Sequence, residues 1–127
     1  MTTALIPLNL ADELADNGAK APALFLGQAR AAERFFDFFT SNMQNKHTRR
    51  AYYNAASKFS EFCAQYGVQD LEHVKPVHVA GYIESLREGF AKPTIKQHLA
   101  AVRMLFDWLV VGQIIDVNPA HAVRVPN

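Results

Sequence analysis

Two separate segments of the chain carry basic side chains and no acidic ones. Residues 46–60 contain Lys46, Arg49, Arg50 and Lys58, and residues 89–105 contain Lys92, Lys96 and Arg103. Cations without neighbouring carboxylates can bind phosphate groups, and the amide of Gln97 could pair with the edge of an adenine base. The chemistry indicated is non-covalent binding of a polyanion such as nucleic acid. Two ordinary solvated helix faces are the alternative.

The overall charge gives this interpretation little support by itself. The 127 residues carry a net charge of +1, and 50% of them are hydrophobic, as is usual for a soluble globular domain. The distribution of charge is more informative. Residues 1–45 hold three basic against five acidic residues, whereas residues 46–127 hold ten against seven. Positive charge is therefore concentrated in the part of the chain that contains both basic segments.

The second basic segment opens a predicted helix over residues 92–111. Apolar residues recur there at helical spacing, at Ile95, Leu99, Val102, Phe106 and Leu109. Lys96 and Arg103 share a second stripe, and Gln97 lies beyond it. Because residues 104–111 are apolar almost all round, we expect a basic helix start that projects from a buried far end.

The first basic segment is expected to open a helix with Thr48 as its N-cap and Gly67 just after its end. The buried stripe of this helix would contain Tyr52, Ala55, Ala56, Phe59, Phe62, Cys63 and Tyr66. Arg50 and Asn54 would lie on the opposite, outer face. Arg49 and Tyr53 would flank that face near the N-terminal end of the helix.

Two shorter helical patterns complete the predicted core. Over residues 27–43 the stripe is Ala29, Ala32, Phe36, Phe39 and Met43. Phe38 points away from this stripe, either toward another part of the bundle or toward a partner. Over residues 76–86, where Pro76 suits the first helical position, the stripe is Val77, Ala80, Ile83 and Leu86.

These patterns predict an all-α fold, a bundle of four principal helices joined by short links, with no strand. Residues 1–26 show no sustained period, and we expect them to form a mobile leader. Residues 27–117 would form the helical domain, and residues 118–127 a largely extended exit segment that serves as a linker.

Other kinds of chemistry find little support in the sequence. The five histidines, at positions 47, 73, 78, 98 and 121, lack metal-ligand spacing, and the single Cys63 suits a buried small hydrophobe. We therefore expect no metal site and no cofactor. His98 is expected to pack in the core. The chain contains no apolar run that could cross a membrane and no secretory signal, which indicates a cytoplasmic location.

Several motifs together resemble a known family. They are KHTRRAY at 46–52, the pair Phe59 and Phe62, VHVAGYIESLR at 77–87, PTIKQHLAAVR at 93–103 and NPA at 118–120. Their order is similar to that in the N-terminal core-binding (SAM-like) domain of tyrosine recombinases, the phage-integrase family. The resemblance covers roughly residues 28–127, and it is the ordered set of motifs, not any single one, that makes it specific.

This resemblance implies a domain that clamps one face of duplex DNA with its second and fourth helices in the major groove. A separate catalytic domain would cut and rejoin strands on the other face. The family's catalytic motifs have no counterpart in this sequence, so we expect no catalytic residue and no strand cleavage by this chain. Protomers bound to adjacent half-sites would touch through the helix at 27–43 or through the C-terminal tail.

The expected DNA-binding residues are Lys46, His47, Thr48, Arg49, Arg50, Tyr53, Asn54, Lys92, Thr94, Lys96, Gln97 and Arg103. Lys96, Gln97 and Arg50 are the expected base readers, and Arg49 and Arg103 the expected phosphate contacts. Two alternatives remain open. One is a helical protein-interaction module with Phe38 on its docking surface. The other is a stand-alone DNA-binding regulator, which differs only in whether a catalytic domain follows Asn127.

Overall fold

A computed structural model describes residues 21–126 of the chain. These residues form four α-helices, α2 (Ala29–Asn42), α3 (Lys46–Gln65), α4 (Pro76–Ser85) and α5 (Lys92–Val111), and two short 3-10 helices, η2 (Ala23–Phe25) and η3 (Leu71–His73). No strand occurs within this range. The prediction of an all-α bundle with four principal helices is confirmed.

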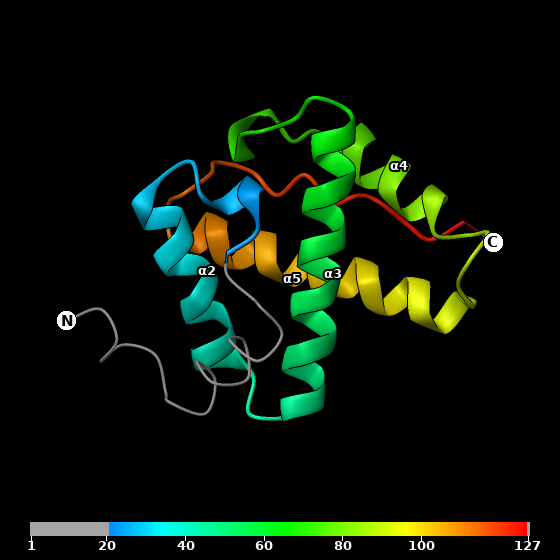
Figure 1. Cartoon of the computed structure of the whole chain (residues 1–127), viewed down its shortest axis with the longest axis horizontal. Coiled ribbons are helices and arrows are strands. Elements are labelled where there is room, and N and C mark those ends of the chain that lie inside the picture. The colour runs from blue at the N-terminus through cyan, green and yellow to red at the C-terminus, as the bar shows by residue number, and fades with distance from the viewer. Residues whose placement is uncertain (1–20, 127) are drawn as a thin grey trace.

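Helix α3 crosses α5 near the centre of the molecule, and this crossing organises the fold (Figure 1). Helix α2 runs antiparallel beside α3, and α4 lies beside the first half of α5. At the centre, the ring of Phe59 lies 5.3 Å from that of Tyr82 and 5.8 Å from that of Phe106. These contacts between α3, α4 and α5 fix the direction in which the starts of α3 and α5 project.

The buried face of α2 differs from the predicted stripe. Ala31, Phe35 and Phe38 are buried together with the predicted Phe39 and Met43, whereas Ala29 is exposed. The reason is that α2 is covered on two sides. The Phe35 ring lies 4.6 Å from that of Phe25 in η2, and the Phe38 ring lies 6.2 Å from that of Trp108 in α5. Phe38 therefore packs inside the bundle, and the suggestion that it forms a docking surface is wrong.

Helix α3 begins two residues before the position predicted from Thr48. Its N-cap is Asn45, whose side-chain oxygen accepts hydrogen bonds from the backbone N–H groups of His47 (2.9 Å) and Thr48 (3.1 Å). The predicted end is confirmed, because Gly67 has a φ of 77° and the N–H of Val68 donates to the carbonyl of Cys63 at 2.9 Å. Tyr66, expected to be buried, is 66% exposed because it lies at this helix end.

Helices α4 and α5 have nearly the predicted bounds. The five stripe residues of α5 are all buried, but Met104 and Val111 are exposed, so the far end of α5 is not buried all round. In α4 the buried residues include Val79 and Tyr82 in place of Val77 and Ala80. A helix of ten residues that touches the bundle on one side leaves several apolar positions outside. None of the helices described is both long and apolar enough to cross a membrane.

The hydrophobic core extends beyond both ends of the expected domain. Leu24 and Phe25 are buried, and the N–H of Leu24 donates to the hydroxyl of Ser60 at 3.1 Å, so the part of the expected leader from residue 21 onward is packed. Residues 1–20 lie outside the described range. At the other end, Ala120 and Val123 are buried as well. The exit segment is thus docked on the bundle from Asn118 to at least Val123.

Candidate nucleic-acid interface

The first turn of α3 combines an exposed cation with the positive end of the helix dipole. Lys46 and His47 are exposed and Thr48 is half-buried, while Asn45 caps the helix start. No acidic residue lies in this first turn. The positive end of the helix dipole adds to the charge of Lys46, so this turn favours an anion.

Arg49 does not share this surface. Only 8% of the residue is exposed, and its Nη1 donates to the carbonyl oxygens of Met43 (3.1 Å) and Gln44 (3.0 Å). The side chain therefore ties the α2–α3 link to the first turn of α3. This placement contradicts the expectation that Arg49 reaches a phosphate, because its guanidinium turns toward the protein.

Arg50, Asn54 and Lys58 form an exposed stripe on α3, spaced at i, i+4 and i+8. The ammonium of Lys58 lies 5.8 Å from the ring of Phe90, which stands just before α5. The stripe therefore faces the corner between α3 and the start of α5. Lys58 is not among the binding residues expected from the sequence, although its spacing of eight residues from Arg50 would place it on the same helix face.

The candidate residues of α5 lie on two flanks of the helix. Thr94 and Gln97 share a flank with Ala101 and Trp108, the side that packs against α3 and α2. Gln97 is exposed and Thr94 is half-buried, at the end of this flank nearest the α3 corner. Gln97 and the Arg50 stripe therefore border the same corner of the fold.

The second flank of α5 carries Lys92, Lys96 and Arg103. Lys92 and Lys96 are exposed, whereas Arg103 is half-buried. Nη2 of Arg103 donates to the carbonyl of Val123, and Nε lies 3.4 Å from that of Ala120. Arg103 thus holds the exit segment, and the expectation that it serves mainly as a phosphate contact does not fit its placement. Lys96 lies on an adjoining surface, not on the α3 side with Gln97.

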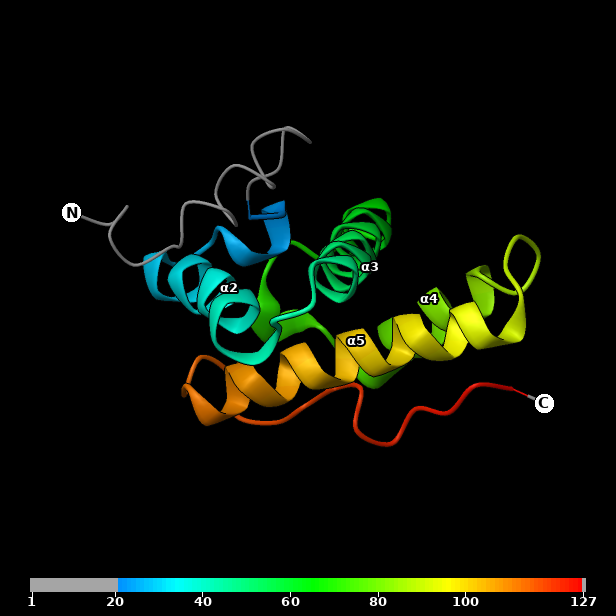
Figure 2. The ribbon, with the colours of Figure 1, turned by 90° about the horizontal axis from the view of Figure 1, so that it is seen from below.

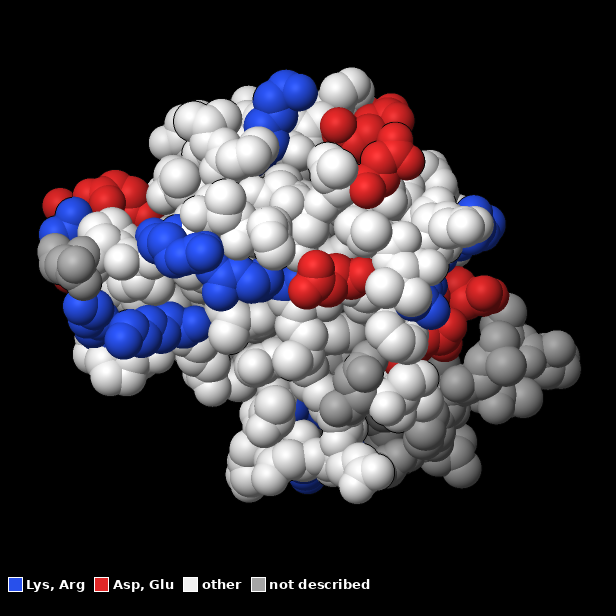
Figure 3. All heavy atoms as spheres, turned by 180° about the vertical axis from the view of Figure 1, so that it is seen from behind, with Lys and Arg blue, Asp and Glu red and all other residues white. Residues whose placement is uncertain are grey.

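Lys and Arg side chains form a visible band on the back of the molecule. Figure 3 shows this band crossing the half of that face where α5 begins and where the chain leaves the bundle. On the same face, acidic side chains lie next to the inner end of this band, at the upper right and at the left edge. The band therefore lies on the side of the molecule that the start of α5 occupies.

A buried polar pair lies directly beneath the interface. The hydroxyl of Tyr82 and Nδ1 of His98 are 2.7 Å apart, and that hydroxyl lies 3.4 Å from the carbonyl of Ala55. Burial, and next the charge of Lys58, lower the pKa of His98, and burial raises the pKa of Tyr82. The neutral His98 can accept the hydrogen bond from Tyr82. The prediction that His98 packs in the core is confirmed.

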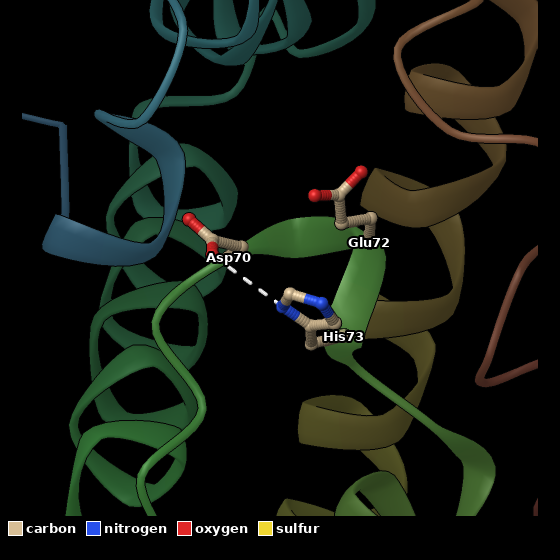
Figure 4. Close-up of side chains that lie close together, drawn as sticks. All are labelled: Asp70, Glu72 and His73. Atoms are coloured by element: carbon tan, nitrogen blue, oxygen red, sulfur yellow. Dashed lines mark ion pairs between the residues drawn. The ribbon is translucent and has the colours of Figure 1, made fainter.

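Groups that could support covalent or metal chemistry are few among residues 21–126. Cys63 is fully buried, and burial raises the pKa of its thiol to about 11, so it is not a reactive nucleophile. Asp70, Glu72 and His73 come within 4.8 Å of one another on the η3 turn (Figure 4). All three are exposed, and His73 and Asp70 form an ion pair at 3.4 Å. Solvated carboxylates on a turn do not by themselves define a metal site.

A family model described as the phage integrase N-terminal SAM-like domain matches residues 32–112. Tyrosine recombinase XerC of Vibrio parahaemolyticus is 29% identical over 100 residues, which cover 74% of this chain and 31% of that protein. XerC of Listeria innocua is 24% identical over 94 residues, which cover 72% and 31% respectively. XerC of Escherichia coli O157:H7 is 30% identical over 66 residues, which cover 51% and 22%.

The chain therefore corresponds to about a third or less of the length of these relatives. No solved structure gives a significant match. The matched region reaches from α2 to the residue that follows α5. Because that match covers most of the bundle, the chain belongs to the phage integrase N-terminal SAM-like domain family, which confirms the resemblance of its sequence motifs.

Proposed function

We propose that this chain is the core-binding DNA-binding domain of a site-specific tyrosine recombinase. It holds one recombination half-site with α3 and α5, and so contributes to DNA recombination and integration. The observation that carries this proposal is that the first turns of both helices lack acidic residues and carry exposed lysines, on two helices that cross near the centre of the fold (Figure 1). Membership of the integrase family supports duplex DNA as the polyanion.

The contacts fall into two groups. Lys46 and His47 in the first turn of α3 bind phosphates, and so do Lys92 and Lys96 on the second flank of α5. Lys96, expected from the sequence to read a base, is assigned to a phosphate here because it does not lie on the α3 side with Gln97. Arg50, Asn54 and Gln97 border the corner between the helices and read base edges in the major groove. Lys58 extends the Arg50 stripe toward α5 and adds a further phosphate contact.

Three of the DNA-binding residues expected from the sequence have a structural role in this proposal and do not contact DNA. Arg49 binds the α2–α3 link, and the Tyr53 ring lies 6.1 Å from the rings of both Phe35 and Phe39. Thr48 is half-buried, and its N–H group already donates to Asn45. These residues hold the start of α3 in position, and their loss would weaken DNA binding through the helix and not through a direct contact.

A salt titration tests the proposal. Binding of the full chain to a fluorescent random-sequence duplex would be followed by anisotropy over a range of salt concentrations. Each phosphate contact contributes a slope of about −0.9 to log K against log salt. Arg87→Ala is the matched control, because Arg87 is exposed on α4's C-terminal side and is paired with Glu84 at 3.0 Å.

We expect Lys46→Ala and Lys96→Ala each to make the slope shallower by about 0.9, the contribution of one phosphate contact. Arg87→Ala should leave the slope unchanged. Absence of binding at low salt would refute the proposal. Equal effects of all three substitutions would show that binding depends on net charge and not on this surface.

Base reading requires a second measurement. The chain would be used to select preferred sequences from a random duplex library, and the selection would be repeated with Gln97→Ala. Loss of a bidentate contact should relax the preference at one base pair by about 1–3 kcal/mol while other positions keep theirs. An unchanged profile would remove Gln97 from the base-reading group.

We further propose that the chain binds DNA without cutting it. Tyr82 is buried with its hydroxyl engaged, and Tyr53 is half-buried among aromatic rings. Incubation with a nicked duplex and denaturing electrophoresis should detect no covalent protein–DNA adduct, and an adduct that depends on a tyrosine would contradict this expectation.

A further inference from the structure

The exit segment, Asn118–Pro126, is fastened to α5 by side chains from both. The amide of Asn118 donates to Oδ1 of Asp107 (2.7 Å) and to the carbonyl of Arg103 (2.9 Å). Its side-chain oxygen accepts from the N–H of Ala120 at 2.8 Å. Together with the buried side chains of Ala120 and Val123, these bonds give the segment one fixed path.

Arg103 is the central element of this attachment. Its Nε and Nη2 point toward the carbonyls of Ala120 and Val123, which are separated from it by 17 and 20 positions in the sequence. The planar guanidinium can serve both carbonyls at once because its donors are arranged as a fork. Arg103 is therefore turned toward the protein along the same flank of α5 that carries Lys96.

Arg124 comes directly after Val123 in the chain, and its side chain is turned outward. The residue is exposed, and its Nη1 donates to the carbonyls of His121 and Val123, both at 3.1 Å. Arg103 and Arg124 thus share the carbonyl of Val123, which brings two positive charges close together. Within residues 21–126 neither guanidinium forms an ion pair with a carboxylate. Two adjacent cations without a counter-ion favour binding of an anion between or beside them.

The path of the exit segment brings its end, which carries Arg124, beside the first half of α5. Figures 1 and 2 both show the segment running back beside the first half of α5, in the direction opposite to that helix. Lys92 and Lys96 are exposed on this half. The band of basic side chains in Figure 3 lies over the same region.

We propose that Arg124 is an additional phosphate contact of the DNA interface, and that Arg103 is the positioning residue that presents it. This inference rests on the proposed DNA-binding function and extends the interface from the two helices to the exit segment. It also changes the role expected of Arg103 from the sequence: Arg124, which lies outside the helix, contacts the phosphate, and Arg103 in α5 holds Arg124 in place.

A double-mutant cycle on the full chain tests this division of roles. The slope of log K against log salt for a random-sequence duplex would be measured for Arg124→Ala, Arg103→Ala and the double variant. If Arg103 acts by holding Arg124, each single substitution removes a slope of about 0.9, and the double variant loses no more than either. If Arg103 contacts a phosphate itself, the two losses add, and the positioning role is refuted.

Two further variants keep the test decisive. Lys46→Ala combined with Arg124→Ala should give additive losses, because Lys46 lies on α3 and shares no partner with Arg124. Arg103→Lys keeps the positive charge but lacks the forked donors of arginine, so it should give the same salt slope as Arg103→Ala. If circular dichroism shows that Arg103→Ala unfolds the chain, Arg103→Lys takes its place in the cycle. A wild-type slope for Arg103→Lys would overturn the positioning role.

The outcomes also separate this inference from the proposal on which it rests. If the unaltered chain fails to bind the duplex at low salt, the DNA-binding function itself is wrong. If the unaltered chain binds but Arg124→Ala leaves both affinity and slope unchanged, the helices form the interface and the exit segment does not contribute.

Discussion

Replacement of Gly112 by alanine should loosen the contact between α2 and the end of α5. Nε and Nη2 of Arg34 donate to the carbonyl of Trp108 at 3.1 and 2.9 Å, and the guanidinium carbon lies 3.5 Å from the centre of the Trp108 ring. A Cβ atom at Gly112 would lie only 2.3 Å from Nε of Arg34. The Arg34 side chain must therefore leave its place in the variant.

The cost follows from the interactions that Arg34 loses. Hydrogen bonds from a charged donor to a carbonyl contribute about 1.5 kcal/mol or more, and a partly exposed cation–π contact adds about 0.5 kcal/mol. The φ of Gly112 is −79°, which alanine adopts freely, so alanine also reduces the entropy of the unfolded chain by about 0.5 kcal/mol. We expect a net loss of about 1.5 kcal/mol, or about 6 °C in Tm.

Urea denaturation followed by circular dichroism would measure this loss, with an unchanged m value as the check on two-state unfolding. The decisive control is the same substitution in an Arg34→Ala background, where no guanidinium obstructs the new methyl group. There Gly112→Ala should be neutral or stabilising by about 0.5 kcal/mol. A loss as large as that in the unaltered chain would refute the steric explanation.

Three other expectations follow from the same structure. Phe59→Ala should cost about 3–5 kcal/mol in urea denaturation, because Phe59 joins α3, α4 and α5, and a cost below about 1 kcal/mol would contradict this central role. Asn45→Ala should cost about 1 kcal/mol by removing the cap of α3, whereas Asn45→Asp should keep most of the stability. Burial lowers the pKa of His98 below its ordinary value of 6.5, so the unfolded chain binds a proton at this residue more readily than the folded chain. The stability that neutral His98 contributes is therefore fully present above pH 6.5 and falls as the pH decreases below 6.5. His98→Gln should flatten this dependence between about pH 7.5 and about pH 5.5, and a variant as pH-sensitive as the unaltered chain would show that other groups cause it.

The elements with strong local signals could be predicted from the sequence. The period of Ile95, Leu99 and Phe106 determines one buried face of α5, and Pro76 and Gly67 mark a helix start and a helix end by their backbone preferences alone. The N-cap Asn45 carried an equally clear signal, since asparagine is as good a cap as threonine. The start of α3 was missed because two competing caps stood close together in the sequence.

Tertiary contacts decided which side of a helix is covered when more than one partner packs on it. Phe38 and Val77 illustrate the two outcomes. Phe38 is buried because α5 covers a second side of α2, and Val77 is exposed because no element within residues 21–126 covers that side of the short α4. Helical period gives the relative directions of side chains, but it does not report where the neighbouring helices lie.

The same limit applies to the interface. Charge along the chain was sufficient to identify the starts of α3 and α5, because each basic segment is local in the sequence. The roles of Arg49 and Arg103 depend on carbonyl groups of the turn before α3 and of the segment after α5. The sequence by itself determined the four helices and their cationic starts. Only the tertiary structure decided which cations face solvent and which bind the protein, because an arginine's partner is set by the path of a chain segment that no periodicity encodes.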